Sequence, residues 1–466
     1  MAAAAVLIAV TLPASVNTTR QDDPKFEQLA SLVTQKMSDY GVPGVAFGLL
    51  RNGQTTMRGF GITNADNPQP LTTDTVFPIA SISKTVTATA IMRLVEQGKL
   101  DLAAPVRRYL PEFAVKDPAV TENVAIWHLL THTPGWEGQL TPEDRGNQSL
   151  AHFAESQRDL PQLAPPGAVW SYNNTGFTIA GRVIEVVTGQ RIHDALRALV
   201  IEPIGLTRTF TRTEDAVTYS FAVAHRTQED KLTVVRPISR SSTVTAGGVW
   251  MTLSDMLAYA KFHLGHGDGA DRKPVLTRAS LEMMRTPRVR KIGTDEEMGL
   301  GWHLRKVGGV MTAAHGGTLG HISLLELVPD RQMAFAILTN HSNGWRLIQD
   351  VERTALKVLE GMTLDPAQTI GHRGLNETMN DAPVMAKQPD AAPYVGIYRR
   401  PPLNTTNTVR AENGQLTLDG NSIGFYAVDR AIVTSGNSRG NPIEFIRTPA
   451  GTVGWVRVVG RIARKD

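Results

Sequence analysis

Cysteine is absent from the 466 residues of the chain. This absence excludes a thiolate nucleophile, disulfide bonds, iron–sulfur clusters and cysteine-bound zinc. It leaves the redox compartment of the protein open, because a chain without thiols is insensitive to its redox environment.

Dense clusters of positive charge are also missing. The formal net charge is only +4, and the most basic groups are Arg399–Arg400 and, near the C-terminus, Arg461, Arg464 and Lys465. Such pairs are usually solvated surface residues. We therefore expect no nucleic-acid partner.

The most apolar run of the N-terminal region is too short to cross a bilayer. It extends from Ala2 to Leu12, whereas a membrane-spanning helix needs about 20 apolar residues. The small residues at 13–15 resemble a secretory cleavage region, although no lysine or arginine precedes Arg20. We expect residues 1–24 to be a leader, no integral membrane span, and a periplasmic or secreted protein. If the leader is not a signal, the location is cytoplasmic.

Strand patterns and helical patterns divide the next part of the chain. Strand-like runs lie on both sides of Asn52–Gly53 and return in "GVMTAAHGG", "HISLLELVPD" and "QMAFAILTN". Helical patterns fall between them, near residues 125–130, 177–187, 192–201 and 253–264. Strands at both ends with helices between predict an α+β domain over residues 25–360, with a mainly antiparallel sheet flanked by helices.

The C-terminal part of the sequence has a different pattern. Residues 361–389 show no sustained period and are predicted to form a linker. Beyond them, short alternating runs such as "YVGIYRR" and "GWVRVVGRI" are separated by Gly, Asn or Pro. This pattern predicts a small all-β domain over residues 390–466.

Ser81 and Lys84 form an S-x-x-K motif at the start of an apolar helix. From Thr85 to Gln97 the apolar residues recur with the i, i+3, i+4, i+7 spacing of a buried face. Residues three apart on a helix share a face, so the lysine can reach the serine hydroxyl. Burial lowers the pKa of a lysine and makes its amine a proton acceptor. Alone, however, the motif is weak, because Ser81 is equally suited to capping the helix.

Tyr172 and Asn174 follow a Pro-Pro-Gly turn and precede another apolar helical pattern. A phenol beside a lysine can share a proton with it, and an asparagine amide can bind a substrate carbonyl. The alternative is a core tyrosine beside a turn asparagine.

His315, Gly316 and Gly317 end one strand pattern shortly before the next begins. Two glycines allow another backbone to approach closely, and a sheet edge can pair with an extended substrate. By contrast, His128 and His132 have helical metal-ligand spacing but lack the intervening glutamate of a zincin and a third ligand. We expect no metal site.

The three motifs together resemble those of the serine β-lactamase and penicillin-binding-protein superfamily. The resemblance is to the branch of class C β-lactamases, D-alanyl-D-alanine carboxypeptidases, D-aminopeptidases and related esterases. It covers roughly residues 26–359 and includes "WHLLTHTPGW", "AGGVWMTLSDMLAYAKF" and "MGLGWHL" in the order typical of that family. It implies a β-lactamase/transpeptidase-like domain and a lipocalin-like C-terminal accessory domain.

This resemblance also implies roles for individual residues. Ser81 is the acylated nucleophile, Lys84 and Tyr172 form the proton-transfer pair, and Asn174 orients the substrate and the lysine. The segment His315–Gly317 also helps to orient the substrate. The backbone N–H groups of Ser81 and Thr318 form the oxyanion hole. Which of Lys84 and Tyr172 is the base stays open, because two such groups titrate as a coupled pair. Since these side chains suffice for acyl transfer, no cofactor is implied.

His315, with Gly316 and Gly317, stands where β-lactamases of this branch usually carry Lys-Thr-Gly. A histidine is largely neutral at pH 7 and suits a substrate carboxylate less well than a charged lysine. The resemblance therefore favours a serine hydrolase that acts on a small ester, amide or peptide, as an esterase first. The alternatives are a D-amino-acid peptidase, a weak β-lactamase and, in another class, a penicillin-binding sensor without turnover. The oligomeric state stays open.

Overall fold

The computed structural model describes residues 23–140, 142, 146–235, 243–265, 274–291, 296–364, 384–412 and 414–466. Nearly all of the predicted leader (residues 1–24) lies outside the described residues, as do residues 365–383 of the predicted linker. The limits of leader, catalytic domain and linker therefore stay predictions.

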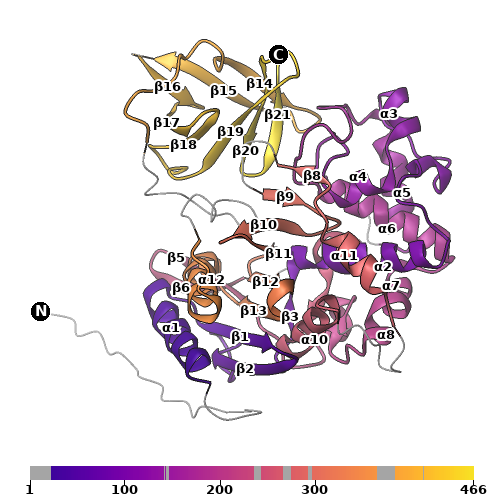
Figure 1. Ribbon diagram of the computed structural model, residues 1–466, viewed down its shortest axis with the longest axis vertical. Coiled ribbons are helices and arrows are strands. Elements are labelled where there is room, and N and C mark those ends of the chain that lie inside the picture. The colour runs from indigo at the N-terminus through magenta and orange to yellow at the C-terminus, as the bar shows by residue number, and fades with distance from the viewer. Residues whose placement is uncertain are drawn as a thin grey trace, which may run out of the picture.

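An eight-stranded antiparallel sheet forms the centre of the larger part of the molecule (Figure 1). Its order is β2-β1-β13-β12-β11-β10-β9-β8, so β1, the first strand of the chain, pairs with β13, which ends at residue 339. Val45 of β1, for example, lies opposite Thr339 of β13. The strands are β1 (Gly44–Arg51), β2 (Gln54–Gly61), β8 (Val289–Arg290), β9 (Glu296–Met298), β10 (His303–Val307), β11 (Val310–Thr318), β12 (Ile322–Val328) and β13 (Met333–Thr339).

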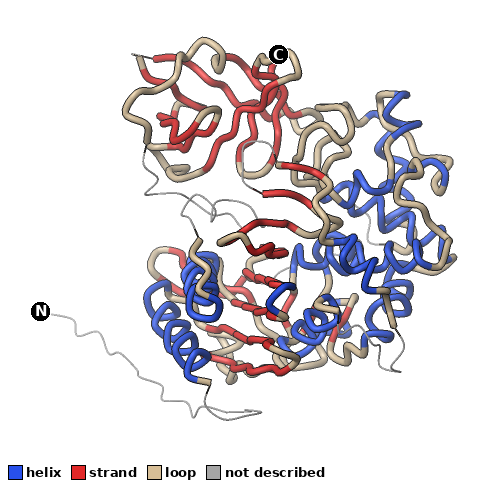
Figure 2. The backbone as a smooth tube through the Cα atoms, viewed as in Figure 1, coloured by secondary structure: helices blue, strands red, loops and turns tan. Residues whose placement is uncertain are grey.

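Helices cover both faces of this sheet (Figure 2). On one face, α1 (Pro24–Tyr40) and α12 (Gly344–Glu360) pack against each other and bury an apolar cluster that includes Phe26, Phe47 and Leu347. Helix α1 begins at Pro24 because the Asp23 side chain caps it by accepting the Lys25 N–H. Proline suits the first helical position, since it has no backbone N–H that would lack a partner there. On the other face, α2 (Ser83–Glu96) and α10 (Leu253–His263) contribute to the main core.

A helical region lies beside that second face and carries the remaining motifs. Its helices are α3 (Pro118–Asn123), α4 (Ile126–Leu130), α5 (Ser149–Glu155), α6 (Asn174–Thr188), α7 (Ile192–Leu196), α8 (Glu202–Ile204), α9 (Thr213–Ala216) and α11 (Arg278–Met284). Two minor sheets lie outside the large one. The first consists of β3 (Phe77–Pro78), β7 (Trp250–Met251) and β4 (Thr209–Phe210). The second, β5 (Ala224–Gln228) and β6 (Lys231–Val235), lies near α12 in Figure 1.

The C-terminal residues close into an eight-stranded antiparallel barrel, drawn in yellow in Figure 1. Phe425, Phe445 and Tyr398 fill its interior with alternating inward-facing residues of neighbouring strands. The strands are β14 (Gly396–Arg400), β15 (Thr405–Glu412), β16 (Gln415–Leu418), β17 (Asn421–Ala427), β18 (Arg430–Val433), β19 (Pro442–Arg447), β20 (Val453–Val458) and β21 (Arg461–Lys465).

The barrel is packed against the larger part rather than merely tethered to it. Ile446 and Ile462 of the barrel share a buried apolar cluster with Leu163 and Val169. At its edge, the Trp455 indole N–H donates to the Leu163 carbonyl at 2.8 Å. This contact brings the β20–β21 turn beside the segment that contains Tyr172.

The sequence predictions of fold class are confirmed: a mainly antiparallel sheet flanked by helices, followed by an all-β domain. Helix α6 extends beyond the predicted residues 177–187, and α10 ends one residue before the predicted 264. Within the described ranges, no helix combines the length and apolar character required to span a membrane.

Candidate active site

Ser81 lies in a strained turn that the sequence did not predict. A single 3₁₀ turn, Ala80–Ile82, precedes α2, which begins at Ser83 rather than at Ser81. Ala80 has a φ of 47°, in the left-handed region that non-glycine residues rarely occupy. The Ser83 hydroxyl stabilises the turn by donating to the Ala80 carbonyl at 2.6 Å. Ser81 is thereby left partly exposed beside buried neighbours, where its hydroxyl is accessible.

Lys84 is held in the first turn of α2, with its side chain fully buried. Its Nζ lies 3.1 Å from Ser81 Oγ and donates to the Ala246 carbonyl at 2.5 Å. Ala246 belongs to a short π-helical segment, η6 (Val244–Gly248), which packs against α2. Burial holds the pKa of Lys84 well below its usual value of 10.5, and the positive charge of Arg461 lowers this pKa further. The amine is thus suited to accept a proton.

Tyr172 faces the lysine from the loop before α6. Lys84 Nζ lies 4.9 Å from the centroid of the Tyr172 ring. Burial raises the pKa of Tyr172 to about 12, while the Ser81 hydroxyl and the charge of Arg461 act to lower it. The phenolic oxygen is buried and has no hydrogen bond of regular geometry in the described part of the chain, although the Ser81 hydroxyl is near enough to influence its pKa. The phenol is therefore neutral near pH 7 and close to both members of the S-x-x-K motif.

Asn174 is the first residue of α6, and Asn173 before it caps the helix. The Asn173 side chain accepts the Gly176 N–H at 2.7 Å and donates to the Trp136 carbonyl at 2.9 Å. Because Asn173 takes the structural role, the Asn174 amide is released from capping. Its Oδ1 is buried without a hydrogen-bond partner in the described parts of the chain, as expected of a group that can bind substrate or lysine.

The end of strand β11 lies directly against the Ser81 turn. A Cβ atom at Gly317 would collide with the Ile79 carbonyl oxygen and the Ser323 hydroxyl. That hydroxyl already donates to the Ile79 carbonyl at 3.0 Å. Only glycine allows this approach, which explains the glycine at this position of the third motif. It also brings Thr318 to the side of the cavity that contains Ser81.

His315 has a different position from the one expected of a substrate-orienting residue. Its imidazole is fully buried, and its Nδ1 lies 2.7 Å from the Gly316 carbonyl. Burial holds its pKa well below 6.5, so the ring is neutral. His315 is not among the residues that line the cavity, whereas Thr318 is.

Ser81, Tyr172, Asn174 and Thr318 line one cavity of about 590 Å³. The opposite wall of this cavity was not predicted from the sequence. It is formed by the barrel and by the loop that follows α4. These further lining residues include Gln139, Arg400, Thr406, Val459 and Arg461. The sequence interpretation of Arg400 and Arg461 as solvated surface was wrong: their side chains are only 22% and 16% exposed. A second cavity of about 500 Å³, beside α5, contains none of the motif residues.

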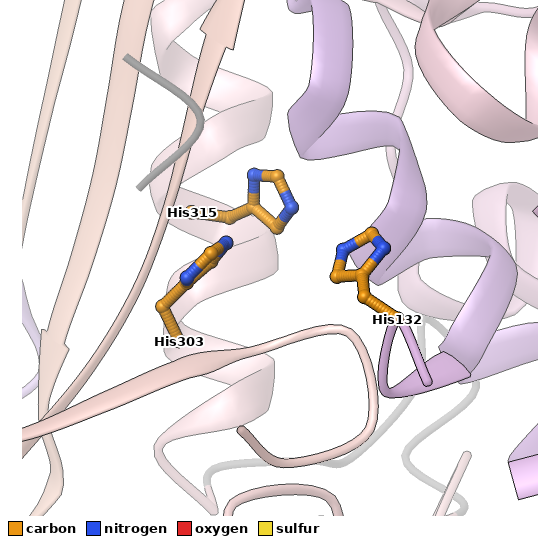
Figure 3. A group of neighbouring side chains, drawn as sticks. All are labelled: His132, His303 and His315. Carbon is orange, nitrogen blue, oxygen red and sulfur yellow. The ribbon is translucent and has the colours of Figure 1, made fainter. Parts of the chain in front are cut away.

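Figure 3 shows three imidazoles that lie close together, and the centroid of each ring lies within 6.5 Å of that of Tyr172. Ring nitrogens of His132, His303 and His315 lie within 4.8 Å of one another. The His132 ring stacks on Tyr172 at 4.5 Å and accepts the Asn173 N–H at 2.8 Å. His128, which shares helical spacing with His132 in the sequence, is not part of this cluster; its ring instead accepts the Ala125 N–H.

A metal ion fits this cluster poorly. Zinc bonds imidazole nitrogen at about 2.1 Å, which requires ligand nitrogens roughly 3.4 Å apart. In addition, Lys291 lies 2.7 Å from His303 Nδ1, and its pKa, lowered by burial to about 8, leaves it charged at neutral pH. Glu296 pairs with this ammonium and balances its charge, and the ammonium in turn occupies the Nδ1 of His303. We interpret the three rings as the packing support of Tyr172.

The family profile named Beta-lactamase matches residues 29–359, which include Ser81, Lys84, Tyr172 and the His315 strand. The chain belongs to the β-lactamase family. A relative from Amycolatopsis lactamdurans, Penicillin-binding protein 4, is 33% identical over 374 residues, or 78% of this chain and 94% of its own length. Esterase EstB of Burkholderia gladioli is 34% identical over 196 residues, or 38% of this chain and 50% of its own.

Solved structures confirm the fold over nearly the whole chain. SurE superposes with a TM-score of 0.78 at 23% identity and covers 95% of this chain and 99% of its own. A class C β-lactamase superposes with a TM-score of 0.63 at 20% identity, over 72% of this chain and 97% of its own. At these identities the likeness concerns the fold alone.

Proposed function

We propose that the protein is a serine hydrolase. A small ester or amide substrate acylates Ser81, and water then hydrolyses the acyl-enzyme. The observation that carries this proposal is the 3.1 Å contact between Lys84 Nζ and Ser81 Oγ. The amine is fully buried and has a depressed pKa, yet the serine beside it opens onto a cavity. Burying an ammonium has a large free-energy cost, whereas a neutral amine in contact with a hydroxyl is arranged for proton transfer.

The directions of the two pKa shifts support Lys84 as the group that takes the first proton. A lysine with a lowered pKa accepts the Ser81 proton, and the serine oxygen forms a bond to the acyl carbon. The negative charge that develops on the carbonyl oxygen is stabilised by the Ser81 and Thr318 backbone N–H groups, which this proposal places as the oxyanion hole. Tyr172, with its pKa raised to about 12, is a neutral donor at this stage.

Collapse of the tetrahedral intermediate breaks the bond to the leaving group. The alcohol or amine departs with a proton from Tyr172, which recovers one from Lys84. A water molecule then attacks the acyl carbon and gives a proton to the same pair. The bond between the acyl carbon and Ser81 Oγ breaks, the carboxylic acid leaves, and the pair returns the proton to the Ser81 oxygen. Asn174, whose Oδ1 is buried without a partner in the described structure, orients the substrate or the lysine.

The family relatives support a choice among substrates. Esterase EstB and Penicillin-binding protein 4 are named for an esterase and for penicillin binding. Because His315 is neutral and buried, a fixed positive charge for a β-lactam carboxylate is missing from the third motif. We place ester hydrolysis first, peptidase action on D-amino-acid substrates second and β-lactam turnover third.

Turnover of a short p-nitrophenyl ester, a D-alanyl amide and nitrocefin by the full chain tests this order. Labelling by a fluorophosphonate probe tests the nucleophile, with Ser81→Ala as the control. The proposal expects labelling of the unsubstituted protein alone and fastest turnover of the ester. An acylation burst without steady-state turnover would favour a penicillin-binding sensor instead.

A further inference from the structure

The backbone of Tyr172 is held by the C-terminal barrel. Its N–H donates to the Gly460 carbonyl at 2.8 Å, and its carbonyl accepts from Arg461 Nη1 at 2.7 Å. The residue before it is held by the same turn, because the Ile462 N–H donates to the Ser171 hydroxyl at 3.2 Å. Both polar backbone groups of this tyrosine thus find their partners in the β20–β21 turn.

The tip of this turn adopts a backbone conformation that needs support. Val459 has a φ of 48°, which is unusual for a β-branched residue. It lies in the wall of the cavity, together with Val458, Gly460 and Arg461. Strained residues of this kind are retained where the surrounding structure fixes them, and they are frequent at functional sites. Here the strained turn is fixed by its contact with Tyr172.

Arg461 lies between the barrel and the proton-transfer pair. Its guanidinium carbon is 5.5 Å from the centroid of the Tyr172 ring. Its Nη1 is 3.8 Å from Glu137, a buried carboxylate that also pairs with Arg400 at 3.3 Å. One carboxylate therefore neutralises only part of the charge of two guanidinium groups.

We propose that Arg461 is a positioning residue for the Tyr172–Lys84 pair, so that the barrel completes the active site. This inference rests on the proposed function. The guanidinium holds the tyrosine backbone by a hydrogen bond and places a permanent positive charge beside both titrating groups. The same charge favours the neutral amine of Lys84 and makes the Tyr172 phenol more acidic.

The pKa directions agree with this geometry. After burial, the charge of Arg461 is the named cause that lowers the pKa of Lys84. It also opposes the rise that burial causes in the pKa of Tyr172. The other charged or titratable groups that face this pair or Arg461 are Glu137, Arg400, His132, His303, His315 and Lys291.

The test is the pH profile of kcat/KM for a short p-nitrophenyl ester, measured with the full chain and four variants. Arg461→Gln keeps an amide donor for the Tyr172 carbonyl but removes the charge. The acid limb of its profile, where kcat/KM falls at low pH, is expected to move to higher pH by about one unit. Without the arginine charge the pKa of Lys84 is higher, so the amine stays protonated up to a higher pH. Arg461→Lys keeps the charge and is expected to keep the acid limb in place.

Glu137→Gln gives a prediction of opposite sign. It leaves Arg461 in place but removes the neutralising carboxylate, so the acid limb is expected to move to lower pH. The matched control is Arg464→Ala, which removes an exposed arginine from the same strand, β21. It is expected to keep the unsubstituted profile. Circular dichroism establishes that each variant is folded.

A merely structural role for Arg461 would lower kcat or stability without moving the acid limb. Unmoved limbs in folded Arg461→Gln and Glu137→Gln would therefore overturn the inference, while the proposed function stood. If Arg461→Gln does not fold, Glu137→Gln tests the inference alone: a shift of its acid limb to lower pH supports the inference, and no shift or a shift to higher pH overturns it. Failure of the unsubstituted protein to turn over any ester or label at Ser81 would instead refute the proposed function.

Discussion

The amine of Lys84 lies 4.9 Å from the centroid of the Tyr172 ring and 3.1 Å from the Ser81 hydroxyl. The two residues are far apart in the sequence and arrive from different elements, helix α2 and the loop before α6. Their environments change the two pKa values in opposite directions: burial lowers that of the lysine and raises that of the tyrosine. Burial thus favours the uncharged form of both groups, which suits a pair that passes a proton back and forth.

Replacing Lys84 with methionine removes the proton acceptor while filling the same buried space. We expect Lys84→Met to stay folded and to lose about a thousandfold in kcat/KM for a p-nitrophenyl ester, within the usual range for a general base. Steady-state kinetics measure the loss, and circular dichroism confirms the fold. Activity within tenfold of the unsubstituted protein would show that another group takes the proton.

The pH dependence of stability provides a separate test of the Lys84 environment. Its folded-state pKa lies below the 10.5 of an unfolded lysine, so the unfolded chain binds more protons between these two values. The stabilising contribution is therefore fully present above 10.5 and is lost as pH falls through the folded-state pKa. Compared with Lys84→Met, the unsubstituted protein should gain melting temperature as pH rises from 6 to about 9. A constant difference between the two proteins would contradict a buried, depressed amine.

Replacing Tyr172 with phenylalanine removes a hydroxyl that has no hydrogen bond of regular geometry in the described structure. The melting temperature should therefore change little. With an alkyl ester or an amide, acylation should slow by about a hundredfold, because the alcohol or amine leaving group loses its proton donor; an activated ester, which leaves as a stable phenolate, should be affected less and serves as the comparison. Stopped-flow measurements of the acylation rate with both kinds of ester test this expectation. A normal rate with the alkyl ester would remove Tyr172 from the mechanism.

Gly317→Ala introduces a methyl group where the Ile79 carbonyl and the Ser323 hydroxyl leave no space. We expect a loss of about 1–3 kcal/mol in the free energy of unfolding, as for other overpacked sites, and slower labelling of Ser81. Gly247→Ala is the volume control, because its added Cβ would meet Ala80 only at 3.8 Å, an ordinary contact. Chemical denaturation of both variants measures the difference. Equal stabilities would show that the Ser81 turn does not depend on this close approach.

The local part of the site was predictable from the sequence, because it depends on spacing along one element. Ser81 and Lys84 are three residues apart, and their contact follows from a single helical turn. The strand pattern of "HISLLELVPD" likewise became β12, because alternation and apolar content reflect burial directly. Even here, the 3₁₀ turn at Ala80 was missed, since it depends on contacts with η6 and β11.

The barrel's contribution could not be predicted in the same way. Arg461 and Tyr172 are 289 residues apart, and their contact depends on how two folded units pack together. No periodicity in "GWVRVVGRI" distinguishes an arginine that faces solvent from one that faces a catalytic tyrosine. Similarly, His132 and His303 converge only because a loop and strand β10 meet in the folded chain. Long-range packing of this kind has no local signal in a single sequence.

The most direct test of the central claim is intact-protein mass spectrometry after brief exposure to an activated ester, followed by peptide mapping. The account predicts one acyl adduct per chain, located on the peptide that contains Ser81 and absent from Ser81→Ala. It also predicts that the adduct disappears with time as water releases the acyl group. An adduct on another residue, or one of equal yield in Ser81→Ala, would contradict the account.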